Sequence, residues 1–135
     1  MIGVIAMAEE VPVVEEFFEL FKTPWDYFDP KQSYDVVITT GDLPARLETK
    51  LLFVYCAAPT PWDAEHGVAF HRKLQGGFID IIDERLPIYG EIATFNSSHG
   101  CIASVTGDSE AVGVQMNLQG TKAIRLGYNL FSEVA

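Results

Sequence analysis

The chain has 135 residues, of which 48% are hydrophobic and 12% aromatic, and its 19 acidic and 9 basic side chains give a formal net charge of −10. This composition excludes a largely disordered chain and disfavours binding to nucleic acids or anionic membranes, because an acidic surface repels phosphate groups. The length suits one domain, residues 1–135, whose small-molecule or protein partner is neutral or basic.

The N-terminal segment predicts a strand, a helix and a short edge strand. Residues 2–7 (IGVIAM) form an apolar run typical of a buried strand, and no basic segment precedes it as in a signal peptide. Within residues 8–21, Val14 and Phe18 recur at helical spacing among several glutamates, which indicates an amphipathic helix. Residues 23–30 (TPWDYFDP) are an aromatic segment between prolines, as expected of an edge strand.

The following segments continue this alternation of strands and helices. Apolar runs at residues 34–41 and 50–56 predict two strands, and residues 76–82 predict another. Between them, residues 62–74 predict a helix, with Gly67 as a weak point inside it. Because strands separated by single helices are typical of βαβ units, we predict an α/β fold. It would be flavodoxin-like or amidotransferase-like, with a mostly parallel sheet flanked by helices.

From about residue 86 the pattern becomes rich in short strands. The strand-like pieces are residues 91–95, 100–107, 111–117 and 121–131, with turns at residues 107–110 and 117–120. This spacing predicts a C-terminal β-hairpin extension of the same domain. No apolar run approaches the ~20 residues that a membrane-spanning helix needs.

Cys56 ends the apolar run at residues 50–56, a position where many α/β enzymes carry a nucleophile. A nucleophile elbow requires flanking glycines and a helix that starts at once, so that the helix N-terminus lowers the thiol pKa. Here Tyr55 and Ala57 flank the cysteine, and a proline-containing connection follows. We therefore expect a buried thiol at the end of a core strand, with catalysis by Cys56 as the alternative.

The sequence HGC places His99 close to Cys101, which makes these two residues further candidates for nucleophilic chemistry. Neighbours in an extended segment rarely point at each other, so we expect no catalytic residue in this domain. His66 and His71 lie five residues apart and do not share a helix face. No metal-binding spacing or phosphate-binding glycine loop is present, so we expect neither a metal nor a cofactor.

Two C-terminal segments carry aromatic side chains beside carboxylates. Tyr89 and Glu91 lie together in one segment, and Tyr128 and Phe131 lie with Glu133 in the other. Aromatic residues with carboxylates at strand ends suit contact with carbohydrate or protein, so Tyr89, Glu91, Tyr128 and Phe131 are candidate ligand or interface residues. The alternative is that they pack the hairpin onto the sheet edge.

Taken in order, these features resemble a class I glutamine-amidotransferase-like domain. The similarity is carried by the strand–helix opening, YDVVITTGD, KLLFVYC, a helix ending in LQGG, and the tail AVGVQMNLQGTKAIRLGYNLF. It is greatest to degenerate relatives around the biotin-protein-ligase N-terminal and trehalose-utilisation-like groups. Active members have a G-x-C-x-G elbow and a C-terminal His-x-Glu pair. Cys56 matches the position but lacks both, so the resemblance does not imply amidotransferase activity.

The tail IRLGYNLFSEVA is also similar to the N-terminal module of some bacterial polysaccharide deacetylase proteins. The resemblance implies a non-catalytic accessory or ligand-binding domain of a glycan-modifying enzyme, with a following catalytic domain or protein partner and possible carbohydrate binding. One alternative is a small cysteine-dependent hydrolase or amidase using Cys56, and another is a dimerisation module that uses its hairpin edge. With two cysteines and no disulfide framework, we expect a cytoplasmic location.

Overall fold

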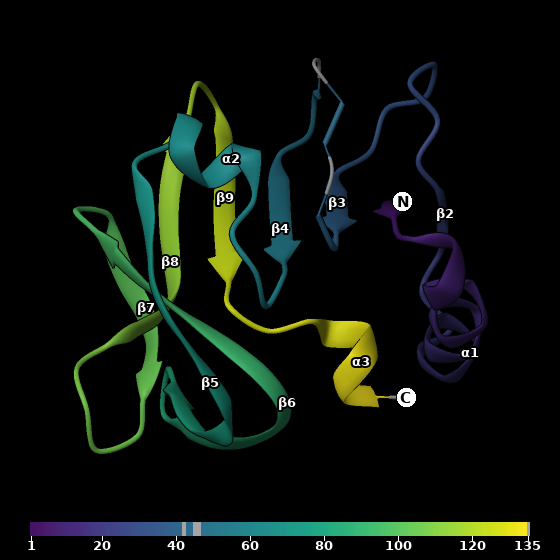
Figure 1. Cartoon of the computed structure of the whole chain (residues 1–135). Helices are drawn as coiled ribbons and strands as arrows, with labels where there is room; N and C mark the ends of the chain where they lie inside the picture. The colour runs from purple at the N-terminus through teal and green to yellow at the C-terminus, as the bar shows by residue number, and fades with distance from the viewer. Residues whose placement is uncertain (42, 45–46, 135) are drawn as a thin grey trace.

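The computed structural model describes residues 1–41, 43–44 and 47–134. The strands are β1 (Ile2–Ile5), β2 (Trp25–Tyr27), β3 (Val36–Thr39), β4 (Leu51–Tyr55), β5 (Val68–Ile81), β6 (Glu84–Ser97), β7 (Gly100–Val105), β8 (Ala111–Leu118) and β9 (Thr121–Leu126). The helices are the 3-10 helix η1 (Ala8–Glu10), α1 (Val11–Phe21), α2 (Pro61–Glu65) and α3 (Leu130–Val134). All of the strands above belong to one sheet, in the order β2-β1-β3-β4-β9-β8-β6-β5-β7 (Figure 1).

One part of the sheet is parallel and consists of β2, β1, β3, β4 and β9. Because side chains alternate along a strand, Ile38 and Phe53 face one side and Val37 and Leu52 face the other. The first side is covered by α1 and α3, and the buried Phe18 of α1 packs into the same apolar cluster as Ile38 and Phe53. The helical layer on this side of the sheet therefore consists of α1 and α3.

The opposite side of the parallel strands has a much smaller cover. Trp62 of the five-residue helix α2 packs with Val37 and Leu52, and Leu43 and Leu47 pack against the edge of this cluster. Figure 1 shows α2 in front of the upper parts of β8 and β9 and beside β4, whereas α1 and α3 lie lower and farther to the right. A short helix cannot cover five strands, so this side of the sheet leaves room for a cavity.

The other part of the sheet closes into a four-stranded barrel. Strand β5 pairs with β6 and β7, and β8 pairs with β7 and β6, all antiparallel. The fully buried Ile79, Ile92 and Val112 belong to one apolar cluster together with Tyr128. Strand β9 joins this barrel to the parallel strands, since it pairs with β4 on one side and with β8 on the other.

The prediction of a mostly parallel α/β fold of the flavodoxin-like or amidotransferase-like kind is wrong. Five of the nine strand pairings in the described residues are antiparallel, and these include the longest pairing, between β5 and β6. The predicted helix at residues 62–74 ends at Glu65, because Gly67 takes a φ of +71° and Val68 begins β5. Pairing with β6 overrides the helical spacing of this segment.

Other predicted elements agree with the structure. The first strand, the first helix and the strands at residues 34–41 and 50–56 correspond to β1, α1, β3 and β4. The C-terminal hairpin exists as β8 and β9, but it lies in the middle of the sheet and not as an extension. None of the helices in the described residues combines the length and apolar character needed to cross a membrane.

Candidate functional site

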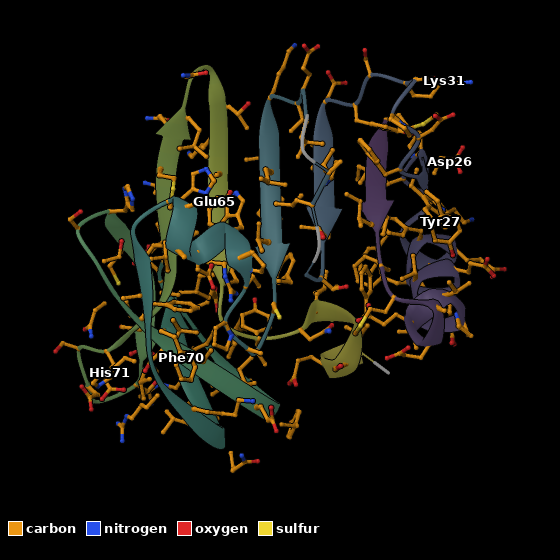
Figure 2. The ribbon with its side chains drawn as sticks, turned by 45° about the horizontal axis from the view of Figure 1, so that its top comes forward. Asp26, Tyr27, Lys31, Glu65, Phe70 and His71 are labelled. Carbon is orange, nitrogen blue, oxygen red and sulfur yellow. The ribbon has the colours of Figure 1, made fainter. Side chains whose placement is uncertain are left out.

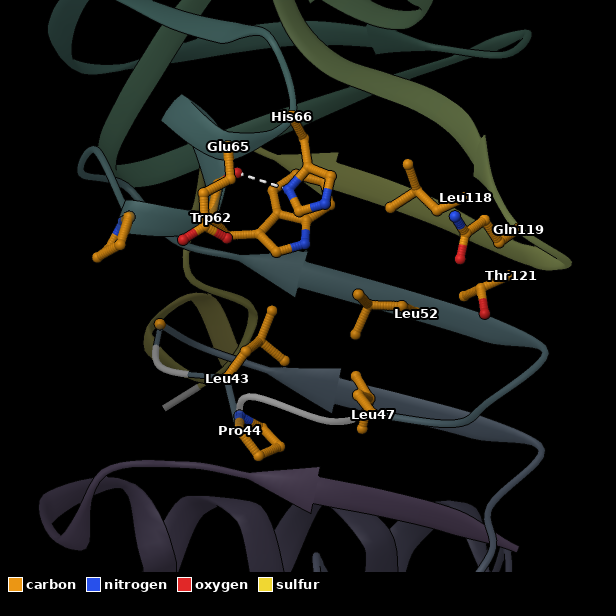
Figure 3. Close-up of a pocket in the computed structure, with 12 residues that line it drawn as sticks. Leu43, Pro44, Leu47, Leu52, Trp62, Glu65, His66, Leu118, Gln119 and Thr121 are labelled. Carbon is orange, nitrogen blue, oxygen red and sulfur yellow. Dashed lines mark hydrogen bonds between the residues drawn. The ribbon is translucent and has the colours of Figure 1, made fainter.

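The less covered side of the parallel strands contains a cavity of about 520 Å³, which we call the α2 pocket. Leucines form its floor: Leu52 of β4, Leu118 at the end of β8, and Leu43 and Leu47 from the connection after β3 (Figure 3). Trp62, Glu65 and His66 lie at one end, and Gln119 and Thr121 lie at the opposite end, beyond Leu118. The pocket therefore has a leucine floor between an aromatic end with polar atoms and a second, polar end.

Helix α2 is fixed at its first turn by a reciprocal cap. The Thr60 backbone N–H donates to Asp63 Oδ2 at 2.9 Å, and the Asp63 N–H donates to Thr60 Oγ1 at 3.3 Å. Pro61 occupies the first helical position, where no intrahelical N–H is required. This cap determines where Trp62 and His66 stand over the sheet.

Arg125 of β9 anchors the same helix from below. Its side chain is fully buried, and its Nε donates to Asp63 Oδ1 at 2.7 Å. Its terminal nitrogens also donate to the carbonyl oxygens of Cys56 and Ala58, each at 2.7 Å, and its guanidinium lies 4.7 Å from the ring centre of Phe95. A buried cation is tolerable only when its charge and donors are satisfied, and here they are. Arg125 thus ties α2 and the connection after β4 to the sheet.

Trp62 and His66 stack with ring centroids 4.4 Å apart and an interplanar angle of 27°. The His66 Nδ1 lies 2.8 Å from the carbonyl oxygen of Trp62, and since a carbonyl can only accept, Nδ1 carries a hydrogen. In neutral His66 the other nitrogen, Nε2, is therefore a hydrogen-bond acceptor.

The polar atoms of these two rings are open to the cavity. Trp62 is only 8% exposed, yet its indole Nε1–H forms no hydrogen bond with the residues that the structure describes. Every fully buried side-chain nitrogen or oxygen in the described residues has a hydrogen-bond partner. Because Nε1 of Trp62 has none, this atom is not fully buried and is accessible to solvent. Figure 3 shows Nε1 of Trp62 and Nε2 of His66 on the same side of the stacked pair, toward Leu118. The pocket thus presents one donor beside one acceptor.

The cysteine and histidine candidates lie elsewhere. Cys56 is half-buried, and its backbone N–H donates to the Leu126 carbonyl. Cys101 is exposed and lines a second cavity, of about 330 Å³ on the barrel, together with His71 and His99. Figure 2 shows His71 on the barrel, well apart from Glu65 of α2.

The barrel cavity does not have the arrangement of a thiol nucleophile and its base. The Cys101 thiol donates to the Ala103 carbonyl at 3.2 Å, and His99 uses Nε2 to contact the carbonyl of His66 at 2.7 Å. His71 Nε2 lies 3.7 Å from a Glu110 carboxylate oxygen. Within the described residues, no group of three or more histidine, cysteine or acidic side chains could hold a metal ion.

The four candidate interface residues divide into two pairs. Tyr89 is 82% exposed and Glu91 is also exposed, where it pairs with Lys73 at 2.9 Å. Tyr128 and Phe131 are buried and belong to two different core clusters.

Glu133 explains why these segments meet. Its carboxylate accepts from the backbone N–H groups of Tyr89 at 2.7 Å and Gly90 at 2.9 Å, which joins α3 to β6.

Burial raises the pKa of Tyr128 above its ordinary value, and the charge of Glu133 raises it further. Burial raises the pKa of Tyr55 in the same way, with the nearby Tyr128 adding to it. Both phenols therefore stay neutral at physiological pH.

We compared the chain with known protein families, curated proteins and solved structures. None of them matches. The resemblance to a class I glutamine-amidotransferase-like domain, and with it to the N-terminal module of polysaccharide deacetylase proteins, is therefore wrong as a family assignment. The fold gives the physical reason, because the residues from Val68 to Leu118 build a barrel where that family requires parallel strands and helices.

Sequence reasoning did not identify Trp62 and His66 as site residues. A signal was present, since T-P-W-D combines a helix N-cap with proline at the first helical position, and two flat side chains four residues apart share a helix face. The floor of the pocket could not be anticipated, because Leu118 is remote in sequence from Leu43 and Leu52.

Proposed function

We propose that this chain is a non-catalytic ligand-binding domain whose α2 pocket takes a small, uncharged and largely apolar molecule with a ring. The observation that carries this proposal is the cavity of about 520 Å³ with a leucine floor and an aromatic end. Small-molecule sites are typically concave, mostly apolar and equipped with a few polar groups that orient the ligand. The α2 pocket is concave, has a leucine floor and carries polar groups at its ends that could orient a ligand.

The charge of the protein favours a neutral or cationic ligand. The chain has a net charge of −10, and Glu65 adds a carboxylate at the aromatic end of the pocket. An anion would have to approach this field and lose its water over leucine side chains, both of which oppose binding.

The link to a glycan-modifying enzyme, through a following catalytic domain or a protein partner, came from the resemblance that the fold overturns, and it stays an untested prediction. Carbohydrate binding likewise stays a prediction. The leucine side chains of the pocket floor offer no hydrogen-bond partner to sugar hydroxyls, so glucose serves as the comparison ligand below. A cytoplasmic location is proposed because Cys56 and Cys101 are both free.

The test is a titration of the full chain with acetophenone, followed by ¹⁵N–¹H NMR spectra. We expect saturable shifts of the Trp62 indole signal with a dissociation constant of about 1 mM, as suits a ligand of this size. The indole signal of Trp25, which packs against Phe18 and is remote from the pocket, is the internal reference. Glucose is expected to produce no saturable shift.

Two variants separate the pocket from non-specific contact. Leu118→Trp places a large ring in the cavity and should abolish the shifts, whereas Leu86→Trp enlarges a half-exposed barrel leucine outside the pocket and should preserve them. Binding that survives in Leu118→Trp, or an absence of binding in the parent protein, contradicts the proposal.

A further inference from the structure

From the aromatic end of the α2 pocket we infer that the ligand carries an amide edge: a primary carboxamide or a lactam attached to, or part of, its ring. This inference rests on the proposed function and specifies the chemical class of the ligand. It comes from the donor and acceptor that the pocket places side by side.

The donor is the Nε1–H of Trp62. This side chain is more than nine-tenths buried, and its only polar atom is unpaired within the described residues and accessible from the cavity. An indole nitrogen can only donate, so a ligand that covers it must offer an acceptor or leave the N–H unsatisfied. A carbonyl oxygen meets that requirement.

The acceptor is Nε2 of His66. The carbonyl of Trp62 holds the hydrogen on Nδ1, and a ligand therefore meets a lone pair on Nε2 when the ring is neutral. Since the two rings stack at 4.4 Å, the donor and acceptor edges run beside each other (Figure 3). A group that covers both edges needs an acceptor and a donor side by side, and a primary carboxamide or lactam carries its carbonyl oxygen and its N–H on the same carbon atom.

The rest of the pocket fits the remainder of such a molecule. The apolar floor formed by Leu43, Leu47, Leu52 and Leu118 extends away from the aromatic pair and would contact an uncharged ring. A carboxylate on the same ring has two acceptors and no donor, so the acceptor Nε2 of His66 would face another acceptor. The carboxylate would also bring a negative charge into the field of an acidic protein, which is unfavourable.

The experiment compares three probes of equal size with the full chain at pH 8, where histidine side chains are mostly neutral. Benzamide has both the acceptor and the donor, acetophenone has only the acceptor, and benzoate has two acceptors and a charge. We expect benzamide to bind about tenfold more tightly than acetophenone, as one to two net hydrogen bonds allow, and benzoate to bind more weakly than either. The Trp62 indole proton should move downfield with benzamide.

His66→Phe tests the acceptor while keeping a flat ring over Trp62. We expect benzamide affinity to fall to the level of acetophenone, with acetophenone affinity changing less than threefold. His71→Phe makes the same substitution on the barrel and should preserve the tenfold preference. If His66→Phe fails to fold, Trp62 indole shifts in the parent protein, compared between benzamide and N,N-dimethylbenzamide, supply the same test of the donated hydrogen bond.

The possible results separate the two proposals. If acetophenone binds and benzamide binds no more tightly, the amide inference is overturned and the ligand-binding pocket stands. If the preference for benzamide persists in a folded His66→Phe variant, the inference is also overturned. If no probe binds, the proposed function fails and the amide inference fails with it.

Discussion

At the scale of single residues, Arg125 determines whether the α2 pocket exists. Its guanidinium is fully buried and satisfied by Asp63 and by the carbonyls of Cys56 and Ala58. Removing one member of a buried ion pair leaves the other charge without a partner, which costs far more than the loss of a surface pair. The stability of α2 and the shape of the pocket therefore depend on one side chain from a different part of the sequence.

We predict that Arg125→Met lowers the free energy of unfolding by about 3–5 kcal/mol, because Asp63 is left as an unpaired buried carboxylate. Urea unfolding measures this change. Arg85→Met, which removes an exposed ion pair with Asp80, is the control and should cost about 1 kcal/mol or less. Losses of equal size in the two variants would show that the buried network does not anchor the helix.

At the scale of secondary-structure elements, the β5–β6 hairpin contains an unfavourable turn. Ile82 is 86% exposed and takes a φ of +56°, although a β-branched residue strongly disfavours that conformation. In this two-residue turn the first central position has positive φ, and glycine is the residue usually found there. The long pairing of β5 with β6 imposes the turn on the sequence.

We expect Ile82→Gly to raise the free energy of unfolding by about 1 kcal/mol, since relief of backbone strain exceeds the added chain entropy of glycine. Thermal and urea unfolding measure the gain. Ile82→Ala removes nearly the same side chain but keeps the Cβ atom, and should leave stability within about 0.5 kcal/mol of the parent. A gain of equal size in both variants would point to the side chain and not to the backbone.

This hairpin also shows where sequence analysis fails. Apolar runs located β1, β3 and β4 because a buried parallel strand is apolar on both faces. The apolar run at residues 76–82 predicted only the second half of β5; its first half has mainly exposed positions, and the turn after it has no glycine or asparagine, so nothing indicated a 14-residue strand. The first half of β5 is a strand because it pairs with β6, and this pairing cannot be read from the local sequence of either segment. The α2 pocket depends in the same way on distant segments.

At the scale of the whole molecule, Gly127 joins the barrel to the parallel strands. Its N–H donates to the Val112 carbonyl at 2.8 Å, and its own carbonyl accepts from Ala93 at 2.7 Å. A side chain at this position would collide with the backbone carbonyl of Ala93. The junction therefore requires a residue without a Cβ atom for steric reasons.

We predict that Gly127→Ala costs about 3 kcal/mol or more, at the upper end of overpacking effects, because backbone and not a flexible side chain must move. Circular dichroism melting measures the loss. Gly41→Ala, at a position with open space around it, is the matched control and should change stability little. A tolerated Gly127→Ala would mean that the barrel can shift relative to the parallel strands.

The position of β9 has a consequence for how the chain is made. β9 ends at Leu126 and comes after every other strand in the described residues, yet it lies between β4 and β8 in the finished sheet. Until those residues leave the ribosome, β4 has an unpaired edge, Asp63 has no Arg125, and the barrel has no connection to the parallel strands through β9. A nascent chain in this state exposes strand edges that can pair with other polypeptides. Productive folding of this domain thus waits until Thr121–Leu126 have been synthesised and can pair with β4 and β8.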